Sequence, residues 1–524
     1  MTGAAPVAML ESRRSGGGNG RPGRPPDAFP PSAASVSTIP LPKSLSEVLA
    51  GLPRREVRSG ADPRISSIAY RSSECEPGSL FFCVPGGRTD GHDHATDAVR
   101  RGAVALLVER WLPEHVPQVL VPSVRRAMGP VSAAFYGWPG DRMITVGITG
   151  TNGKTTTTYL LESVFRAAGL VPGVIGTTGL RLDGRPAPLA RTTPEAPDLH
   201  RTLAEMEATG VRALAMEVSS HGLHQHRVGG VRFSCAVFTN LSQDHLDYHG
   251  SLEEYMRAKA MLFTPEMAKR AAVNVDAPEG RRLLRPDLPS LTYGLESEAE
   301  VRGVDVETTG DGIAFRVDGS MVRANLRGLF NVYNCLAALA AARSVGIDDG
   351  ATIEGLAAVR GVPGRLEPVE EGQDFLVVVD YAHTPDSLEN VLRAVRPLAD
   401  GRLIVAFGCG GDRDRAKRPV MGRVATSLAD LTVVTSDNPR SEDPIAIIGE
   451  IEPGAKEGGG MYVVEPDRRA AIRLAVSEAS AGDVVVIAGK GHESGQEFAD
   501  RTIPFDDRIV VAEELRGVRE GSGR

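Results

Sequence analysis

The segment over residues 144–157 constrains the fold of this chain more than any other part of the sequence. A β-branched run is followed by a glycine turn and then by Lys154 and Thr155. Glycines in such a turn let backbone N–H groups point toward an anion. Lys154 can reach the β- and γ-phosphates of a nucleotide, and the Thr155 hydroxyl can bind Mg²⁺. The segment therefore predicts a phosphate-binding loop that joins a strand to a helix.

The flanking sequence supports this interpretation, with one departure. An apolar helical stripe follows over residues 160–168 and ends at Gly169, a residue suited to the end of a helix. The first glycine of the general phosphate-loop pattern would fall at Ile148, which Gly147 and Gly150 flank instead. The alternative is an ordinary glycine-rich turn after a strand. The order of strand, turn, Lys-Thr and amphipathic helix disfavours that alternative.

Composition excludes several classes of protein. A chain of 524 residues is too long for one core and predicts about three domains. A net charge of −8 argues against a nucleic-acid groove, and no apolar run approaches the roughly 18 residues that cross a bilayer. The five cysteines are scattered singly, without the spacing of metal ligands, so we expect reduced thiols in a cytoplasmic protein.

The first 42 residues are rich in Gly, Pro, Ser, Ala and Arg and have almost no apolar periodicity. Such a segment cannot bury enough surface to offset its ordering entropy, so we expect residues 1–42 to form a disordered tail. Its Arg and Ser content faintly resembles an organellar transit peptide, although a clear amphipathic stripe is missing. A start codon placed too far upstream would give the same pattern.

Three α/β units are predicted after the tail, over residues 43–140, 141–363 and 364–524. In the central unit strands alternate with helices, which predicts a mostly parallel sheet with helices on both faces. The elements predicted in the first unit are helices over 45–52 and 95–101 and strands near 65–70, 80–84 and 103–108. The strands predicted in the third unit are 375–379, 403–407, 431–435 and 484–488. Each strand of the third unit runs into a polar or glycine-rich turn, which predicts a ligand crevice at one sheet edge.

Two side chains near the phosphate loop are candidate metal ligands. Glu217 ends an apolar strand predicted over 213–218, where a carboxylate is costly to bury without a partner that Mg²⁺ would supply. His245 follows a strand predicted over 235–239 and is the second candidate. Either residue alone is more often only hydrogen-bonded, but beside a phosphate loop the metal role is favoured.

An ordered series of motifs resembles the Mur ligase family, closest to its MurE branch, over about residues 43–515. The motifs are residues 150–157, 217–221, 244–247, 255–259, 331–334, 364–367, 380–385 and 437–440. The resemblance implies an N-terminal UDP-sugar-binding domain, a central ATPase domain of the P-loop type and a C-terminal Rossmann-like domain that presents the amino acid. Residues 71–73, Arg-Ser-Ser, stand where the family often has Asp-Ser-Arg.

The resemblance changes the interpretation of Lys259. By itself, a lysine in the helix opened by the capping-box pattern at Ser251 is expected to be solvated. The resemblance implies that Lys259 is carbamylated, which offers a hard cation the oxygen ligands that an ammonium cannot provide. The implied Mg²⁺ ligands are Thr155, Glu217, His245 and the Lys259 carbamate. The implied catalytic residues are Lys154, His245 and Lys259.

The resemblance also assigns residues to the three substrates. The residues implied for ATP are Gly150, Thr151, Asn152, Gly153, Lys154, Thr155, Thr156, Asn334, Arg365 and Asp380. Those implied for the nucleotide-peptide substrate are Ser72, Thr192, Thr193, Ser219, Gln225, Arg227 and Lys259. Those implied for the amino acid are Arg413, Asp437, Asn438, Pro439, Arg440, Gly489 and Glu493.

The activity that the resemblance implies is ATP-dependent addition of diaminopimelate to UDP-N-acetylmuramoyl-L-alanyl-D-glutamate through an acyl phosphate. This step of peptidoglycan precursor synthesis would serve cell-wall biogenesis, cell shape and cell division, and a cytoplasmic monomer is expected. Arg440 indicates diaminopimelate, because its guanidinium can bind the second carboxylate, whereas L-lysine would leave it facing no anion. L-lysine addition stays an alternative, as do folylpolyglutamate synthetase and a nucleotide-binding or plastid protein without catalysis. The domain before the phosphate loop disfavours the synthetase.

Overall fold

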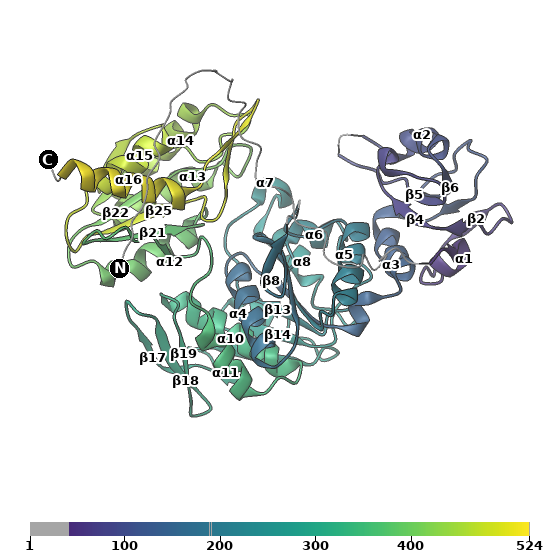
Figure 1. Ribbon diagram of the computed structural model, residues 1–524, viewed down its shortest axis with the longest axis horizontal. Coiled ribbons are helices and arrows are strands. Elements are labelled where there is room, and N and C mark those ends of the chain that lie inside the picture. Colours follow the sequence, from purple (N-terminus) through teal and green to yellow (C-terminus); the bar gives the residue numbers. More distant parts are fainter. Residues whose placement is uncertain (1–40, 88, 188, 190, 523–524) are drawn as a thin grey trace, which may run out of the picture. The chain divides into compact units, whose positions relative to one another are not determined.

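The computed structural model describes residues 41–87, 89–187, 189 and 191–522 (Figure 1). The predicted disordered tail, residues 1–42, lies outside this range except for its last two residues. The described residues lie within one compact unit that spans residues 38–524. No helix in the described part of the chain combines the length and apolar character needed to cross a membrane.

The first part of the unit carries a five-stranded sheet in the order β2-β7-β6-β5-β4, parallel except at β2, and a separate β1–β3 pair. Its elements are β1 Lys43–Ser44, α1 Leu45–Val48, β2 Glu56–Arg58, β3 Arg64–Ile65, β4 Ser67–Ala69, η1 Ser72–Glu74, β5 Ser79–Phe82, η2 Gly91–His94, α2 Ala95–Arg100, β6 Ala103–Val108, β7 Gln118–Leu120, α3 Val124–Tyr136 and η3 Pro139–Arg142. The strand predicted near 65–70 is divided, because β3 pairs with β1 whereas β4 pairs with β5. The helix predicted over 45–52 ends at Val48, shortly before Gly51 and Pro53.

The central part carries a nine-stranded sheet in the order β11-β10-β9-β12-β8-β13-β14-β15-β16, in which β10 pairs antiparallel with both β11 and β9 and all other pairs are parallel. A three-stranded antiparallel sheet, β17 to β19, follows it. The elements are β8 Ile144–Thr149, α4 Lys154–Ala167, β9 Pro172–Gly176, β10 Gly179–Leu182, β11 Arg185–Ala187, α5 Ala196–Ala208, β12 Ala213–Glu217, α6 Ser220–His224, β13 Cys235–Phe238, α7 Leu246–His249, α8 Leu252–Ala260, β14 Ala271–Asn274, α9 Pro278–Arg281, β15 Ser290–Gly294, β16 Val301–Arg302, β17 Val304–Thr308, β18 Ile313–Val317, β19 Ser320–Ala324, α10 Leu329–Ser344 and α11 Asp349–Ala358.

The last part carries a six-stranded sheet in the order β20-β21-β25-β22-β23-β24, parallel except at β20, and a β26–β27 hairpin. Its elements are β20 Glu367–Pro368, β21 Leu376–Asp380, α12 Pro385–Val395, η4 Arg396–Leu398, β22 Leu403–Phe407, α13 Lys417–Leu428, β23 Leu431–Val434, α14 Pro444–Gly458, β24 Met461–Val464, α15 Arg468–Ser477, β25 Val484–Ala488, β26 Gly495–Glu497, β27 Thr502–Pro504 and α16 Asp507–Ser522. The four predicted strands β21, β22, β23 and β25 are adjacent and parallel, so their carboxyl ends meet at one edge.

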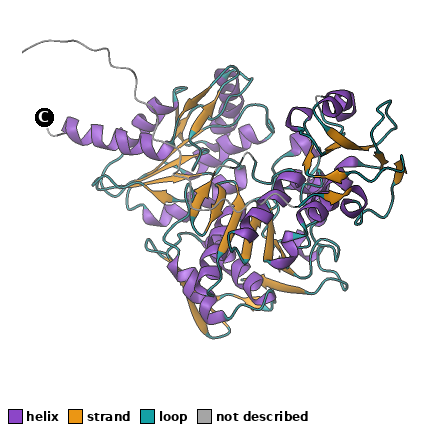
Figure 2. Cartoon of the chain, turned by 45° about the vertical axis from the view of Figure 1, so that its right-hand side comes forward, coloured by secondary structure: helices purple, strands orange, loops and turns teal. Residues whose placement is uncertain are grey.

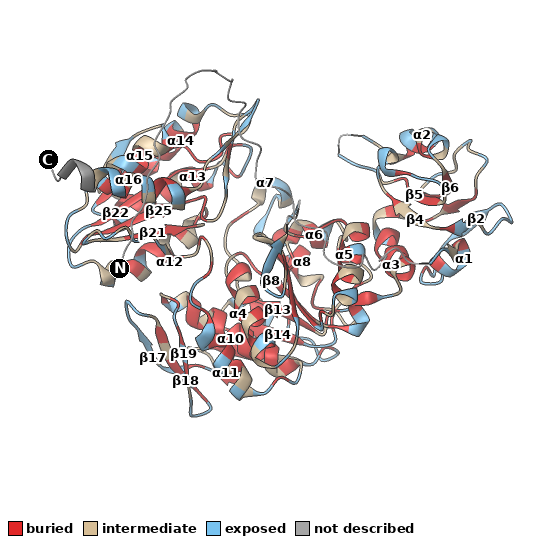
Figure 3. Ribbon diagram, in the orientation of Figure 1, coloured by how far each residue is buried: buried red, intermediate tan, exposed pale blue. Residues whose placement is uncertain are grey.

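The central parallel strands β12, β22 and β25 are buried on both faces, with helices covering each side (Figures 2 and 3). In β12, Ala213 and Ala215 pack toward α4 and α10, whereas Leu214 and Met216 pack toward α5 and α8. This alternation follows from the two-residue repeat of a strand, and burial on both faces explains why these strands read as continuous apolar runs. All five cysteines are free and buried.

Candidate active site

The loop between β8 and α4 forms the phosphate cradle that the sequence predicts. β8 lies between β12 and β13, so the carboxyl ends of three parallel strands surround the loop. Gly150 and Gly153 have φ of +150° and +86°, and a Cβ at either position would collide with the side chain of Thr239 or Asn334. Gly153 caps α4 without a side-chain acceptor, which leaves the helix N-terminus open to an anion.

Two lysines converge on one carbonyl of this loop. Lys154 Nζ donates to the carbonyl oxygens of Gly150, at 2.9 Å, and Thr151, at 2.7 Å. Lys259 Nζ also donates to the Gly150 carbonyl, at 2.8 Å, and lies 4.1 Å from the centre of the Tyr255 ring. Lys259 is 1% exposed, so the expectation of a solvated lysine from its helix alone is wrong. Burial lowers the pKa of both lysines, that of Lys259 well below its usual value, and the charge of Lys154 lowers the pKa of Lys259 further.

Glu217, at the end of β12, is 1% exposed. Among the described residues, its carboxylate accepts hydrogen bonds from Thr177, at 2.9 Å from the backbone N–H and 3.0 Å from the hydroxyl, and from no other residue. No lysine, arginine or histidine in the described part of the chain forms an ion pair with it. His245 begins α7 with φ of +55°, and its Nε2 lies 3.4 Å from Asp244 Oδ2. Burial lowers the pKa of His245 to about 3, so its imidazole is neutral at neutral pH.

The donor chemistry of Thr155, Glu217 and His245 suits a divalent cation. Carboxylate and hydroxyl oxygens are ligands that Mg²⁺ prefers, whereas a neutral imidazole is more typical of softer divalent metals. The buried Glu217 carboxylate, which has no ion-pair partner among the described residues, is the strongest indication. The described residues contain no group of three or more His, Cys, Asp and Glu side chains arranged to hold a metal ion. A metal here therefore needs ligands of other kinds as well.

Five residues predicted for the nucleotide-peptide substrate lie beside Glu217. The Thr193 hydroxyl donates to the Glu217 carbonyl, at 3.0 Å, and accepts from the Ser219 N–H, at 3.1 Å. Arg227 donates to the Thr193 carbonyl, at 3.2 Å, and to Gln225 Oε1, at 2.6 Å. The Thr192 hydroxyl lies 3.4 Å from that of Thr177, which contacts Glu217.

Ser72 lies elsewhere, in η1, where it lines a cavity of about 560 Å³. Arg125, Arg191 and Glu195 line the same cavity, and Glu195 Oε1 lies 3.2 Å from Arg227 Nε. Through Glu195 the cavity is therefore connected to the residues beside Glu217. Sequence analysis missed the two arginines, although Arg191 directly precedes Thr192.

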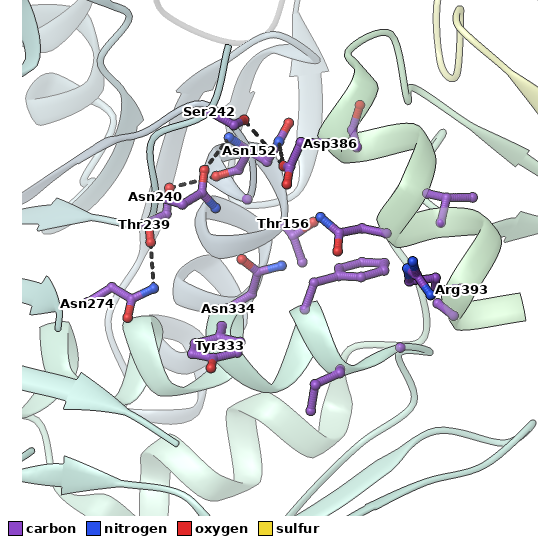
Figure 4. Close-up of a pocket in the computed structure, with 18 of the residues that line it drawn as sticks. Asn152, Thr156, Thr239, Asn240, Ser242, Asn274, Tyr333, Asn334, Asp386 and Arg393 are labelled. Atoms are coloured by element: carbon purple, nitrogen blue, oxygen red, sulfur yellow. Dashed lines mark hydrogen bonds between the residues drawn. The ribbon is translucent and has the colours of Figure 1, made fainter. Parts of the chain in front are cut away.

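Six of the ten residues predicted for ATP line a second cavity, of about 570 Å³, beside the phosphate cradle (Figure 4). The predicted residues in its lining are Asn152, Gly153, Thr156, Asn334, Arg365 and Asp380. The other four, Gly150, Thr151, Lys154 and Thr155, lie in the cradle itself. Arg365 Nη2 donates to Thr155 Oγ1, at 3.0 Å, and its guanidinium lies over the Tyr381 ring. Burial raises the pKa of Asp380, which accepts the N–H groups of Leu366 and Ala382.

Asp386 was not predicted and contacts this cavity directly. Its Oδ2 accepts from Asn152 Nδ2, at 2.8 Å, and from the Ser242 hydroxyl, at 3.3 Å (Figure 4). Asp386 follows the predicted motif over residues 380–385 by one position, so proximity in sequence was the one signal that could have identified it.

The turns after β22, β23 and β25 bring the residues predicted for the amino acid to one sheet edge. Asn438 Nδ2 donates to Glu493 Oε2, at 2.8 Å, beside the buried Asp437. Gly489 directly follows β25 and has φ of +117°. Arg413 is exposed and donates to the Asp412 carbonyl, and the Pro439 carbonyl accepts from the Glu442 N–H.

The expectation that L-lysine would leave Arg440 facing no anion is wrong. Its Nε donates to Glu497 Oε2, at 2.9 Å, and its Nη1 donates to the Gly411 carbonyl, at 2.8 Å. Glu497 comes from β26, a hairpin strand that sequence analysis did not identify. Arg440 is therefore a partly paired cation whose Nη2 makes no hydrogen bond with any described residue.

Comparisons with known proteins identify the family. The chain matches the Mur ligase family catalytic domain over residues 64–136, the Mur ligase middle domain over 148–342 and the Mur ligase glutamate ligase domain over 364–491. It is 49% identical over 479 residues to a UDP-N-acetylmuramoyl-L-alanyl-D-glutamate--2,6-diaminopimelate ligase of Geobacillus thermodenitrificans, covering 89% of this chain and 98% of that protein.

Two solved structures share the fold. A structure of a UDP-N-acetylmuramoyl-L-alanyl-D-glutamate--2,6-diaminopimelate ligase is 33% identical, with a TM-score of 0.66 over 91% of this chain and 100% of that one. The MurF ligase of Thermotoga maritima in complex with ADP is 19% identical, with a TM-score of 0.59 over 87% of this chain and 97% of that one. The predicted α/β fold with N-terminal, middle and C-terminal Mur ligase domains is confirmed, and the chain belongs to the Mur ligase family.

Proposed function

We propose that this protein is an ATP-dependent ligase that adds diaminopimelate to UDP-N-acetylmuramoyl-L-alanyl-D-glutamate in cytoplasmic peptidoglycan precursor synthesis. The observation that carries the proposal is the convergence of Lys154 and Lys259 on the Gly150 carbonyl beside the unpaired carboxylate of Glu217. A nucleotide-binding module without catalysis has no need of a second buried lysine there. The 49% identical relative bears the name of this activity.

The first chemical step is acyl phosphate formation. The γ-carboxylate of D-glutamate attacks the γ-phosphorus of ATP, the bond to the β–γ bridging oxygen breaks, and ADP leaves. Lys154 at the cradle would balance the charge that builds up on the phosphoryl oxygens, and Arg227 would orient the attacking carboxylate. Backbone N–H groups at the start of α4 would bind the phosphates.

The second step is amide formation. The amine of the incoming amino acid attacks the acyl carbon, a tetrahedral intermediate forms, a proton is lost from nitrogen, and inorganic phosphate leaves. Exclusion of water protects the acyl phosphate from hydrolysis. Arg365 would contribute to this exclusion of water, because its hydrogen bond to Thr155 connects the segment that begins at residue 364 to the phosphate cradle.

We infer that Thr155, Glu217, His245 and a carbamate on Lys259 would hold Mg²⁺. The ion supplies a Lewis acid that withdraws charge from the phosphoryl oxygens. A lysine reacts with CO₂ as the neutral amine, and its lowered pKa favours that form of Lys259.

Arg440 and Glu493 support diaminopimelate as the amino acid. The guanidinium would bind the distal carboxylate, and Glu493 would bind the distal ammonium.

We place the domain boundaries after residues 42, 140 and 363. We also expect a monomer, and we expect Ser72 to contact the uridine end of the substrate.

Incubation with Mg-ATP, the UDP-linked dipeptide and a panel of amino acids tests the proposal, with ADP release and product mass as readouts. We expect one ADP per product and preference for diaminopimelate. Preference for L-lysine would favour the lysine-adding alternative, glutamate addition to a folate would favour folylpolyglutamate synthetase, and no turnover would favour a non-catalytic protein.

A further inference from the structure

Lys490 is a buried cation that the proposed mechanism leaves without a role. It follows β25, and its side chain is 0% exposed. Nζ donates to Asn438 Oδ1, at 2.8 Å, and to Glu493 Oε2, at 3.1 Å, and it lies 3.8 Å from Asp437 Oδ1. All three partners of this ammonium belong to the predicted amino-acid site.

The second buried cation of this region has a structural role instead. Arg468 binds Asp507 through two hydrogen bonds and donates to the carbonyls of Ser436 and Ala488. These contacts join α15, α16 and the sheet. None of these hydrogen bonds involves a carboxylate of the amino-acid site, although the guanidinium is close enough to Asp437 and Glu493 for their charges to raise its pKa. Structural support of the sheet edge is therefore provided without Lys490.

The hydrogen bonds of Lys490 fix which atoms of its partners remain available. Glu493 Oε2 accepts from both Lys490 and Asn438, whereas no donor in the described part of the chain bonds to Oε1. Asp437 Oδ1 is buried and has no hydrogen-bond partner among the described residues. One ammonium thus lies within 4 Å of two carboxylates, at 3.1 Å from Glu493 Oε2 and 3.8 Å from Asp437 Oδ1, and leaves Glu493 Oε1 without a donor among the described residues.

We propose that Lys490 is a positioning residue for the amino-acid substrate, which holds Glu493 and Asn438 and balances the charge of Asp437 and Glu493. Without the Lys490 ammonium, Asp437 and Glu493 would repel the carboxylates of the incoming amino acid more strongly. Glu493 could also rotate away from the distal ammonium of that amino acid. The inference rests on the proposed function, because it requires an amino acid at this edge.

The test compares Lys490→Met, Lys490→Gln, Glu493→Gln and the double variant Lys490→Met/Glu493→Gln. The control is Lys456→Met, which removes an exposed lysine of α14. Steady-state kinetics give KM for diaminopimelate and kcat, and hydroxylamine trapping of the acyl phosphate without amino acid reports whether the ATP half of the enzyme is folded and active.

We expect Lys490→Met to raise KM for diaminopimelate by at least about tenfold, with kcat within about threefold and acyl phosphate trapping retained. Lys490→Gln keeps a donor without the charge and should fall between wild type and Lys490→Met. Because Lys490 acts through Glu493, adding Lys490→Met to Glu493→Gln should change KM by less than about threefold. Lys456→Met should match wild type.

An unchanged KM in Lys490→Met, additive effects in the double variant, or equal loss of trapping and ligation would each overturn the inference. Failure of the wild type to ligate diaminopimelate would overturn the proposed function and this inference with it. Normal wild-type turnover together with normal Lys490→Met kinetics would overturn the inference alone.

Discussion

Replacement of Arg440 by alanine should remove the preference for diaminopimelate over L-lysine. In the structure Arg440 already pairs with Glu497 and the Gly411 carbonyl, so the expected discrimination is smaller than that of an unpaired buried cation. A hydrogen bond between charged groups contributes about 1.5–3 kcal/mol, which corresponds to roughly ten- to hundredfold in kcat/KM.

The loss should affect one substrate selectively. kcat/KM for diaminopimelate should fall by roughly ten- to hundredfold in Arg440→Ala, whereas kcat/KM for L-lysine should change by less than about threefold, because lysine has no distal carboxylate. Stability should change by only about 0–1 kcal/mol, since the partner Glu497 is 52% exposed.

Competition assays with both amino acids, read by product mass, measure the ratio directly. Arg423→Ala is the matched control, because Arg423 is an exposed arginine of α13 that pairs with Glu457. If wild type uses both amino acids equally, or if Arg440→Ala retains the wild-type ratio, Arg440 does not select the substrate.

Three further predictions concern buried titratable side chains. Lys259→Ala should lose at least about a hundredfold in kcat and recover part of it with added short carboxylates; wild-type turnover in this variant would contradict carbamylation. Lys154→Ala should fold normally but lose acyl phosphate formation by roughly a hundred- to thousandfold, and ligation within about tenfold of wild type would argue against the cradle. Burial lowers the pKa of His200 to about 4 from its usual 6.5, so its contribution to stability is complete above pH 6.5 and is lost as the pH falls from 6.5 to about 4. That contribution is about 3 kcal/mol, and urea unfolding of His200→Gln should show a flatter pH dependence over this window; equal slopes for variant and wild type would refute it.

Sequence analysis predicted the parts of the site that depend on local pattern. Residues that are adjacent in the sequence determine these parts. They are the glycines of the cradle, the strand end at Glu217 and the turns after β22, β23 and β25. Strands 103–108, 403–407 and 484–488 coincide with β6, β22 and β25, because continuous apolar runs between turns have few alternative structures. Ser251 accepts from the Glu254 N–H as its capping pattern predicts.

Contacts between distant segments could not be predicted in the same way. The partner of Glu217 is Thr177, 40 residues away, that of Asn152 is Asp386, 234 residues away, and that of Arg440 is Glu497, 57 residues away. None of these pairs follows from periodicity or spacing, since each depends on how strands are ordered in a sheet or how loops pack. For this reason the expectation about the anions that face Arg440 was wrong, although its motif correctly predicted its position in the turn after β23.

Oxygen transfer from the UDP-linked dipeptide tests the proposed chemistry most directly. The γ-carboxylate of D-glutamate is labelled with oxygen-18, and the inorganic phosphate released during ligation with diaminopimelate is analysed by mass spectrometry. Attack of that carboxylate on the γ-phosphorus predicts one labelled oxygen in each phosphate. Product formation with unlabelled phosphate would contradict an acyl phosphate and with it the role assigned to the cradle.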